Sequence, residues 1–429
     1  MLGWLLNLAY VLFLLLCSPI LLFRAIGQGK YRSGWGQKLW GNVPEPQSGA
    51  GPRIWLHAVS VGEVLQLRQI IEQLRSRQAD VQVIVSTTTQ TGYQVAHEKL
   101  PNVHVIYFPL DFTWSVSRAI ERIRPDLIVL VELEVWPNFL RTAFAKPIPV
   151  GLINGRLSAR SFRGYRRIRF LLAPLLRQLA FVAVQSEEYA ERFRAMGTPD
   201  SRCHVTGSIK FDGVRTSRDQ PLTQELKNLF QIQDGDSVLI AGSTQDPEES
   251  LALDIYQQLL PDFPNLRLIL VPRHPERGAD ITRLVGSRNL PLVRRSQPKA
   301  ADRLVSRPVG LLDTVGELGA CWGLADIAFV GGSFGNRGGQ NMLEPAAYGA
   351  AVCFGPNTWN FRQIVELLTN QQAVRVLQSP DEFTSFVREM LTNRAAAIEL
   401  GQRAQQLVLS QQGATQRTVD LIHQNLPVT

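Results

Sequence analysis

The sequence predicts an α/β fold of two Rossmann-like, doubly wound domains that face each other across a cleft, preceded by a membrane-anchor helix. Three observations lead to this prediction: the chain length, two series of strand-like runs separated by helical patterns, and an apolar first segment. At 429 residues the chain exceeds the ~250–300 residues at which a single core usually stops growing. Hydrophobic residues make up 45% of it and charged residues 19%, so two cores can be filled.

The first segment, from Leu2 to Phe23, is almost continuously apolar and carries no charge. A helix needs ~20 such residues to cross the hydrocarbon core of a bilayer. The segment lacks the basic start and cleavage site of a secretory signal peptide, so we expect an uncleaved anchor over residues 1–25. Basic residues follow it: Arg24, Lys30, Arg32 and Lys38. The positive-inside rule then places the rest of the chain in the cytoplasm. The alternative is an apolar helix lying in the membrane surface, on the same side.

A first series of short, β-branched runs begins at Arg53 and alternates with helical patterns. Its members are Ile54–Val59, Val81–Ser86, Val103–Phe108, Leu127–Val131, Val150–Ile153 and Phe181–Val184. Strands separated by helices form βαβ units, and runs without inside-out alternation are typical of a parallel sheet covered on both faces. This series predicts a domain over residues 26–212.

A second series predicts another domain over residues 213–429, with Gly213–Asp236 as the connecting segment. Its members are Val238–Ala241, Leu266–Val271, Leu290–Val293, Ile327–Val330, Ala351–Phe354 and Ala373–Val376. Ligands of doubly wound domains bind near the carboxyl ends of the strands, so the loops there are where we look for function.

Charge and cysteine content limit the partners. Lys and Arg number 45 against 37 Asp and Glu, and the net charge of +8 favours acidic partners such as phosphates, anionic lipids or nucleic acid. The cysteines are scattered, without a CxxC pair: Cys17, Cys203, Cys321 and Cys353. This spacing encodes neither a disulfide framework nor a zinc site, and it fits a reducing compartment.

Acidic residues follow two strands of the first series. Glu63 stands in the first turn of a predicted helix, where exposed amides and the helix dipole favour the ionised carboxylate that a general base requires. An ordinary first-turn glutamate would look the same. Glu132 and Glu134 come where another strand ends, before a Trp-Pro stop, and suit the wall of a cleft.

A basic segment follows the next strand. It carries Arg156, Arg160, Arg163, Arg166 and Arg167, interleaved with aromatic and apolar residues. Such a segment fits a membrane surface or an anionic lipid headgroup. Nucleic acid would accept the same charges, but the anchor favours lipid, and we expect no nucleic-acid partner.

The second half contains residues suited to an anionic donor. Lys210 offers a point charge, and Arg273, followed by His274, a planar fork for phosphate. A strand, a glycine loop and a helix start follow at residues 329–345, and Glu344 there is placed to accept hydrogen bonds from ribose hydroxyls. The loop matches neither GxGxxG nor GxxxxGKS, which argues against dehydrogenase and P-loop functions.

Seven segments in order, HAVSVGE, ELEVWPN, RLSARSFRGY, KFD, PRHPER, GEL and NMLEP, resemble those of the 3-deoxy-D-manno-octulosonic acid (Kdo) transferases. The resemblance runs from the anchor to about residue 370. It implies an inverting GT-B glycosyltransferase that uses CMP-Kdo and a lipid A precursor, lipid IVA, in lipopolysaccharide biosynthesis at the cell inner membrane. It also implies that the first domain binds the acceptor, the second binds the CMP-sugar, and neither a cofactor nor a metal is needed.

By the same resemblance, Glu63 is the general base, and Glu132 or Glu134 and Lys210 stabilise the transition state. The residues implied for the CMP site are Pro272, Arg273, His274, Val315, Gly316, Glu317, Asn341, Met342, Leu343 and Glu344. The sequence departs from the family pattern at Ser208, Gln245 and Gln340, where asparagine, histidine and histidine are common. Two alternatives stay open: a GT-B transferase that uses a UDP-sugar, and an inactive membrane-anchored nucleotide-binding protein.

Overall fold

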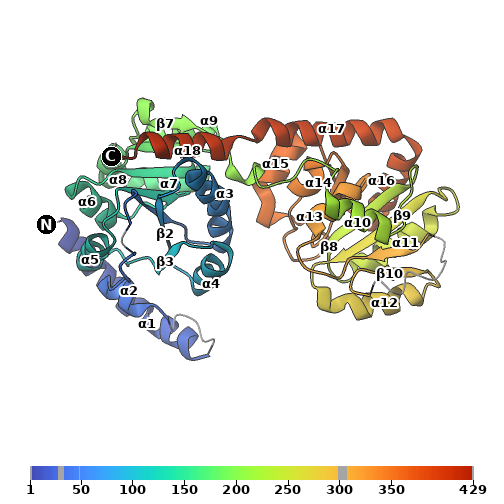
Figure 1. Ribbon diagram of the computed structural model, residues 1–429, viewed down its shortest axis with the longest axis horizontal. Coiled ribbons are helices and arrows are strands. Elements are labelled where there is room, and N and C mark those ends of the chain that lie inside the picture. The colour runs from blue at the N-terminus through green and yellow to red at the C-terminus, as the bar shows by residue number, and fades with distance from the viewer. Residues whose placement is uncertain (1, 28–32, 48, 298–306, 428–429) are drawn as a thin grey trace. The chain divides into compact units, whose positions relative to one another are not determined.

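The computed structural model describes residues 2–27, 33–47, 49–297 and 307–427, so Lys30 and Arg32 lie outside the described residues. The chain divides into two compact units (Figure 1). Unit 1 comprises Met1–Gly213 and Gln412–Thr429, and unit 2 comprises Val214–Gln411. Each is built around a seven-stranded parallel sheet, which confirms two α/β units.

Unit 1 has the strand order β3-β2-β1-β4-β5-β6-β7. Its strands are β1 (Arg53–His57), β2 (Gln82–Thr87), β3 (His104–Tyr107), β4 (Leu127–Val131), β5 (Val150–Gly155), β6 (Phe181–Val184) and β7 (Cys203–Val205). Its helices are α1 (Leu2–Gly27), α2 (Trp35–Trp40), α3 (Val61–Arg77), α4 (Gln90–Lys99), α5 (Thr113–Ile123), α6 (Pro137–Ala145), α7 (Ala159–Arg167), α8 (Arg169–Leu176), α9 (Glu187–Met196) and α18 (Ala414–Gln424). The chain reverses its direction across the sheet between β1 and β4, the position where doubly wound sheets open a crevice.

Unit 2 repeats this order as β10-β11-β9-β8-β12-β13-β14, with its reversal between β8 and β12. Its strands are β8 (Ser237–Thr244), β9 (Leu266–Pro272), β10 (Leu292–Arg294), β11 (Val309–Leu311), β12 (Ile327–Val330), β13 (Ala351–Phe354) and β14 (Arg375–Val376). Its helices are α10 (Pro221–Leu229), α11 (Glu248–Leu259), α12 (Gly278–Gly286), α13 (Leu318–Cys321), α14 (Leu343–Ala347), α15 (Arg362–Asn370), α16 (Pro380–Thr392) and α17 (Arg394–Gln411).

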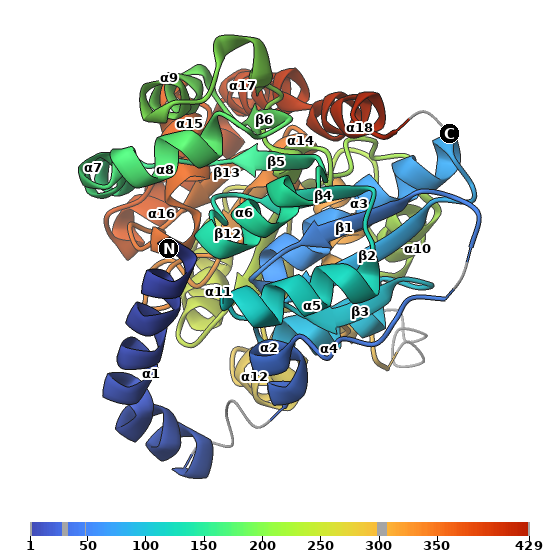
Figure 2. The same ribbon diagram turned by 90° about the vertical axis from the view of Figure 1, so that its left-hand side faces the viewer.

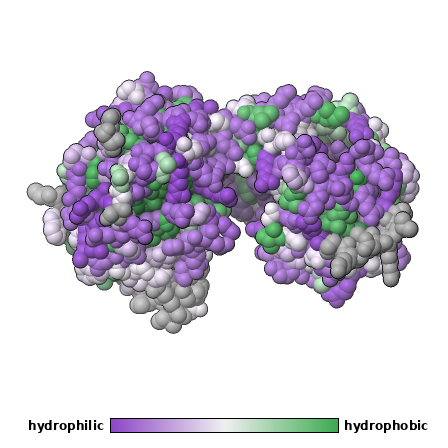
Figure 3. Space-filling model, viewed as in Figure 1, coloured by the Kyte–Doolittle hydropathy of each residue, from purple (hydrophilic) through white to green (hydrophobic). Residues whose placement is uncertain are grey.

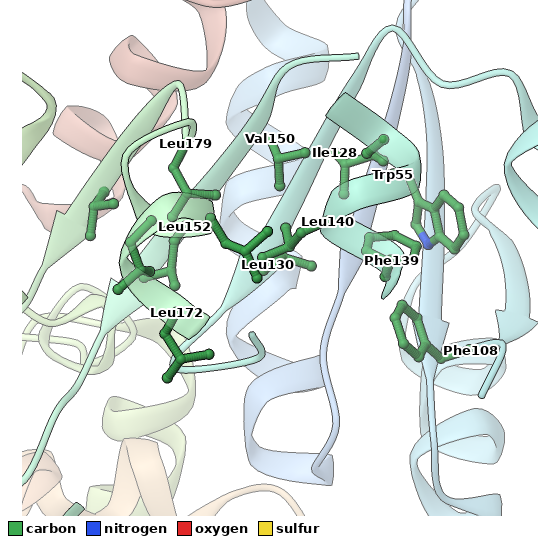
Figure 4. Packing of buried hydrophobic residues seen from close by; sticks show 14 of the residues in the cluster. Trp55, Phe108, Ile128, Leu130, Phe139, Leu140, Val150, Leu152, Leu172 and Leu179 are labelled. Carbon is green, nitrogen blue, oxygen red and sulfur yellow. The ribbon is translucent and has the colours of Figure 1, made fainter. Parts of the chain in front are cut away.

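Helices cover both faces of the first sheet. On one face α5, α6, α8 and α9 pack onto β1, β4, β5 and β6. Figure 4 shows part of this core, where Trp55 and Phe108 lie beside Phe139 of α6. On the other face lie α3, α4 and α18. Burial on both faces explains why the predicted strands are apolar throughout.

The end of the chain differs from the prediction. The sequence assigns residues 412–429 to the second domain, whereas the structure places them in unit 1. The cause is α18, which buries Ala414, Val419 and Ile422 in the same cluster as the apolar side of α3. An ion pair between Arg77 and Asp420 joins the two helices.

The predicted first helix is present as α1, and Figure 2 shows it as one long helix. It does not confirm a single-pass anchor. None of the helices in the described part of the chain combines the length and hydropathy that a bilayer crossing requires.

Candidate active site

The acidic residues predicted from the sequence gather at the carboxyl-terminal edge of the first sheet, where the chain reverses. Glu63 follows β1 in the first turn of α3, and Glu132 and Glu134 follow β4. Because β1 and β4 are neighbours, the loops after them lie next to each other. The charge of Glu63 raises the pKa of both other carboxyls, so the acids lie within electrostatic reach of one another.

The Glu63 carboxylate is held by its own helix start. Ser60 is the N-cap of α3, and the two residues form a capping box. Oε1 of Glu63 accepts hydrogen bonds from the Ser60 hydroxyl at 2.6 Å and the Ser60 amide at 3.3 Å. Oε2 accepts one bond from the Val59 amide at 2.9 Å. The side chain is buried and fixed, so the ordinary capping role and a catalytic role are both compatible with its geometry.

Glu132 occupies a strained position. Its φ of 61° lies in the left-handed region, which costs a residue other than glycine roughly 1–3 kcal/mol and often marks a functional site. Burial and the nearby Glu63 raise the pKa of Glu132, whereas Lys210 and Arg156 lower it. These two cations therefore lie within electrostatic reach of Glu132, although Arg156 follows β5 and Lys210 stands in the 3-10 turn Ile209–Phe211, far away along the chain.

Glu134 is the most perturbed acid of the group. Burial above all, together with the charges of Glu63 and Glu132, raises its pKa to about 7, although a hydrogen bond from Trp136 opposes the rise. That bond joins Nε1 of Trp136 to Oε2 of Glu134 at 2.9 Å. Two carboxyl groups in one site with pKa values moved upward are a common property of catalytic clefts.

Asn154, at the end of β5, was not predicted from the sequence to be a site residue. It is fully buried, and its φ of 52° repeats the left-handed conformation of Glu132 on the neighbouring strand. Its Nδ2 donates to Oε1 of Gln66, which stands one turn after Glu63 on α3. A polar residue directly after a buried strand, before glycine, was the available signal.

The predicted basic segment forms α7 and the start of α8. Arg156 is half-buried and within electrostatic reach of Glu132, whereas the other four predicted arginines are exposed: Arg160, Arg163, Arg166 and Arg167. Phe162 and Tyr165 pack against the core of unit 1 and orient the helix. The arginines therefore form a basic surface on unit 1, and its partner stays a prediction.

The predicted donor residues lie at the equivalent edge of the second sheet. Pro272 ends β9 and is buried, and Arg273 and His274 follow it with exposed side chains. The Arg273 amide donates to the Thr244 carbonyl at 2.9 Å, which ties this loop to the end of β8. The Arg273 guanidinium is accessible to a phosphate.

Two adjacent glutamates that the sequence analysis missed organise this edge. Oε2 of buried Glu248 accepts from the amides of Gln245 at 3.0 Å and Gly332 at 2.7 Å. Its Oε1 accepts from the amides of Ser333 at 3.0 Å and Phe334 at 3.1 Å. The neighbouring Glu249 accepts from Thr244 and Arg277. One carboxylate thus holds the loops after β8 and β12 together, and its only signal was an acidic pair at a helix start.

The carboxylate of Glu317 already bonds to side chains of unit 2. Glu317 forms a forked ion pair with Arg295, with contacts of 2.7–3.1 Å, and accepts from Thr314. Val315 is 85% exposed, and Gly316 has a φ of 89° with open space around it. A donor could contact Val315 and the backbone of Gly316, whereas the Glu317 carboxylate already has its partners.

The segment Asn341–Glu344 enters α14. Asn341 donates to Glu344 at 3.1 Å and accepts from the Leu343 amide at 3.1 Å. The side chains of Met342 and Leu343 are buried and serve packing, so only Asn341 and Glu344 offer polar groups. Burial raises the pKa of Glu344, and Asn341 and Arg215 oppose the rise.

Two departures from the family pattern meet at one point. A Cβ placed on Gly332 would lie 3.4 Å from Nε2 of Gln245 and 3.4 Å from Nε2 of Gln340. The third, Ser208, is buried in unit 1. Over the described ranges, no group of three or more His, Cys, Asp and Glu could hold a metal ion.

Comparison with known proteins identifies the family. The family model described as 3-deoxy-D-manno-octulosonic-acid transferase (kdotransferase) matches residues 31–213. The 3-deoxy-D-manno-octulosonic acid transferase of Haemophilus influenzae is 32% identical over 424 residues, which cover 96% of this chain and 97% of that protein.

Two solved structures share the fold. The UDP-GlcNAc 2-epimerase of Neisseria meningitidis, bound to UDP-GlcNAc, matches with a TM-score of 0.58 and 15% identity over 87% of this chain and 100% of its own. MurG of Acinetobacter baumannii matches with a TM-score of 0.55 and 17% identity over 87% of this chain and 99% of its own. Because the similarity to the Haemophilus influenzae protein extends along nearly the whole of both chains, this chain belongs to the 3-deoxy-D-manno-octulosonic acid transferase family.

Proposed function

We propose that this glycosyltransferase moves Kdo from CMP-Kdo to the lipid A precursor lipid IVA, with inversion, in lipopolysaccharide biosynthesis. The observation that carries the proposal is the grouping of Glu63, Glu132, Glu134, Lys210 and Arg156 at one edge of the first sheet. The edge offers a base, acids and cations within one site. The family relationship supports the choice of sugar.

Glu63 is the proposed general base. A carboxylate has about four lone-pair positions, and three of those on Glu63 are occupied by Val59 and Ser60. The remaining position, on Oε2, can accept the proton of an acceptor hydroxyl while the other bonds keep the carboxylate oriented. The acceptor oxygen then attacks the anomeric carbon of Kdo as CMP departs.

Charge stabilisation is the proposed role of the neighbouring residues. Lys210 and Arg156 offset the negative charge of the Kdo carboxylate and the donor phosphate. Glu132 or Glu134 stabilises the positive charge that develops on the sugar ring. The half-buried position of both acids strengthens such interactions because water screens them less.

Unit 2 is the proposed CMP-binding unit of a GT-B glycosyltransferase. The Arg273 guanidinium offers hydrogen-bond donors for the phosphate, and Glu344 offers an acceptor for ribose hydroxyls. Glu248 fixes the loops after β8 and β12 by accepting from their amides. His274, Val315 and Asn341 follow β9, β11 and β12 of the same sheet. We propose that neither a metal nor another cofactor takes part.

Membrane attachment through α1 is part of the proposal. Hydrophilic residues dominate the face of both units seen in Figure 3. On α1, in contrast, Trp4, Leu8, Phe13 and Leu16 are 57–80% exposed. The polar Asn7 of the same helix faces unit 1. Exposed apolar residues and a buried polar residue are the reverse of a normal surface helix. They support our proposal that the apolar side of α1 enters the cytoplasmic leaflet of the membrane. The arginines of α7 are proposed to bind anionic headgroups of the same leaflet.

Mass analysis of the products tests the function. We expect the protein, incubated with CMP-Kdo and tetraacylated lipid A precursor, to add Kdo to the lipid. Glu63→Gln should lower the rate at least ~10²-fold while the exposed control Glu191→Gln keeps it. If calorimetry shows tight binding of UDP and none of CMP, the donor is a UDP-sugar instead. Binding of CMP without transfer would favour the inactive nucleotide-binding protein.

A further inference from the structure

Two helices beside the acidic edge begin without a cap of their own. Helix α5 starts after Phe112 and α6 after Trp136, and neither side chain accepts a hydrogen bond from the first turn. The first amides of a helix have no partner within it, so a buried helix start needs acceptors from elsewhere. Helix α6 continues directly from the loop that carries Glu132 and Glu134.

Asp111 supplies the cap of α6. Its Oδ2 accepts from the Asn138 amide at 3.0 Å and its Oδ1 from the Phe139 amide at 2.7 Å. The Asn138 side chain donates back to the Asp111 carbonyl at 2.6 Å. Asp111 is 3% exposed, and this burial raises its pKa to about 6, whereas the amides and Tyr10 oppose the rise. The hydrogen bonds that Asp111 accepts from Tyr10, Asn138 and Phe139 therefore fix the position of its carboxylate.

Helix α1 supplies the other contacts. Oδ1 of Asn7 accepts from the Thr113 amide at 3.1 Å and from Nδ2 of Asn138 at 3.2 Å. Its Nδ2 donates to the Thr113 hydroxyl at 2.7 Å, and the Tyr10 hydroxyl donates to Asp111 at 2.9 Å. The first turns of α1 accordingly lie beside the starts of α5 and α6, as both Figure 1 and Figure 2 show.

The contact is close as well as polar. A Cβ placed on Gly3 would lie 3.0 Å from Thr113 and 3.3 Å from Asn138. The rings of Tyr10 and Phe112 meet edge to face at 6.0 Å. Although most of α1 exposes apolar side chains, its segment from Gly3 to Tyr10 packs closely against the rest of unit 1.

We infer that Asn7, Tyr10, Asp111, Thr113 and Asn138 form a polar clamp through which α1 positions the acidic loop, with Asp111 as a positioning residue for transfer. The clamp fixes the start of α6, and Trp136, the last residue before α6, donates to Glu134. A shift of the α6 start therefore moves Trp136 and the carboxyl that it holds. The inference rests on the proposed function of this edge, and it makes α1 more than a membrane attachment.

Kinetics on a water-soluble acceptor test the inference with the full chain. The variants are Asn7→Ala and Asp111→Asn, and the matched control is Ser18→Ala, whose hydroxyl donates to the Leu15 carbonyl within α1. The acceptor is the deacylated form of the lipid, which needs no membrane. A displacement of ~1 Å can cost ~10²-fold in rate, so we expect kcat to fall at least ~10-fold at an unchanged KM for CMP-Kdo.

Hydrogen exchange followed by mass spectrometry separates this inference from the proposed function. In Asn7→Ala we expect residues 132–139 to exchange faster than in the parent, while α9 is unchanged. Unchanged exchange in 132–139, or full kcat on the soluble acceptor in folded variants, overturns the clamp. If the parent protein transfers no sugar, the proposed function fails, and the exchange result still decides the clamp. Should Asp111→Asn not fold, Asn7→Ala carries both measurements.

Discussion

At the residue scale, Glu134 couples the acidic edge to stability. Its pKa is raised from the ordinary 4.5 to about 7, first by burial and then by Glu63 and Glu132. The folded protein thus holds this proton more tightly than the unfolded chain. The stability that Glu134 contributes is fully present below about pH 4.5 and is lost as the pH rises through about 7.

The variant Glu134→Gln removes this titration and keeps an acceptor for Trp136. We expect it to raise the melting temperature relative to the parent by a few degrees at about pH 8 and by less at about pH 5. Calorimetric scans of parent, variant and the exposed control Glu191→Gln at both pH values measure the difference. A gain of the same size at both pH values would contradict the raised pKa.

The four amides that point at Glu248 lead to a second prediction. In Glu248→Gln an NH₂ group replaces one acceptor oxygen and faces two amide donors, so the loops after β8 and β12 separate. Lost bonds to a charged group cost roughly 1.5–3 kcal/mol each, and ~1.4 kcal/mol is tenfold in affinity. We expect CMP to bind at least ~10-fold more weakly by calorimetry. Equal affinity in Glu248→Gln and in the exposed control Glu366→Gln would show that Glu248 does not position the donor loop.

At the element scale, hydrophobic runs predict the sheets well. Every predicted run overlaps an observed strand, because strands buried on both faces are apolar along their whole length. The two missed strands, β7 and β11, have three residues each, too few to show a period. Only the tertiary structure explains why β11 carries a glycine: a Cβ on Gly310 would lie 2.9 Å from the ring of Phe230.

Some site residues could not be predicted from the sequence because tertiary contacts bring them together. The position of Glu63 follows from a local signal, the capping box, and so was predictable. The gathering of Lys210 and Arg156 around Glu132 depends on strand order, which periodicity does not encode. Glu248 looked like an ordinary first-turn glutamate, because three of its four partners lie 84–86 residues away along the chain.

Helix α18 gives a prediction for a single element. Ile422 is fully buried in the cluster that α18 shares with α3, and Asp212 accepts from the amides of Gly413 and Thr415 at the helix start. Ile422→Ala should lower the free energy of unfolding by roughly 2–5 kcal/mol in urea denaturation. The exposed control Gln424→Ala should change it little. Hydrogen exchange should accelerate in α3 and not in α17; the reverse would show that α18 supports unit 2.

At the scale of the whole molecule, both units have candidate residues near the place where the chain reverses across the sheet. In unit 1 they follow β1 and β4, and in unit 2 Arg273 and Asn341 follow β9 and β12, which flank β8. This position follows from doubly wound topology and needs no particular sequence, which is why unrelated ligands occupy it in many proteins. The chemistry of each edge then depends on a few residues. Acids and cations mark unit 1, and amides fixed by Glu248 mark unit 2.

The proposed membrane binding would use two separate surfaces of unit 1, the apolar side of α1 and the arginines of α7. Each basic residue near an anionic surface contributes ~1 kcal/mol, so Arg163, Arg166 and Arg167 changed together to Glu should weaken binding at least ~10²-fold. Sedimentation with vesicles containing anionic lipid measures this loss. The charge-matched control reverses three exposed arginines of unit 2, Arg283, Arg362 and Arg394.

The two surfaces respond differently to salt, which tells them apart. Screening weakens headgroup contacts of the arginines, so binding of the parent should fall as ionic strength rises. Leu12→Ser with Leu16→Ser removes exposed apolar area from α1 and should weaken binding to neutral vesicles as well, because burial of that area does not depend on charge. Sedimentation of the arginine variant equal to that of the parent on anionic vesicles would rule out the α7 surface. Unchanged binding of the leucine variant to neutral vesicles would show that α1 is not a membrane-binding surface.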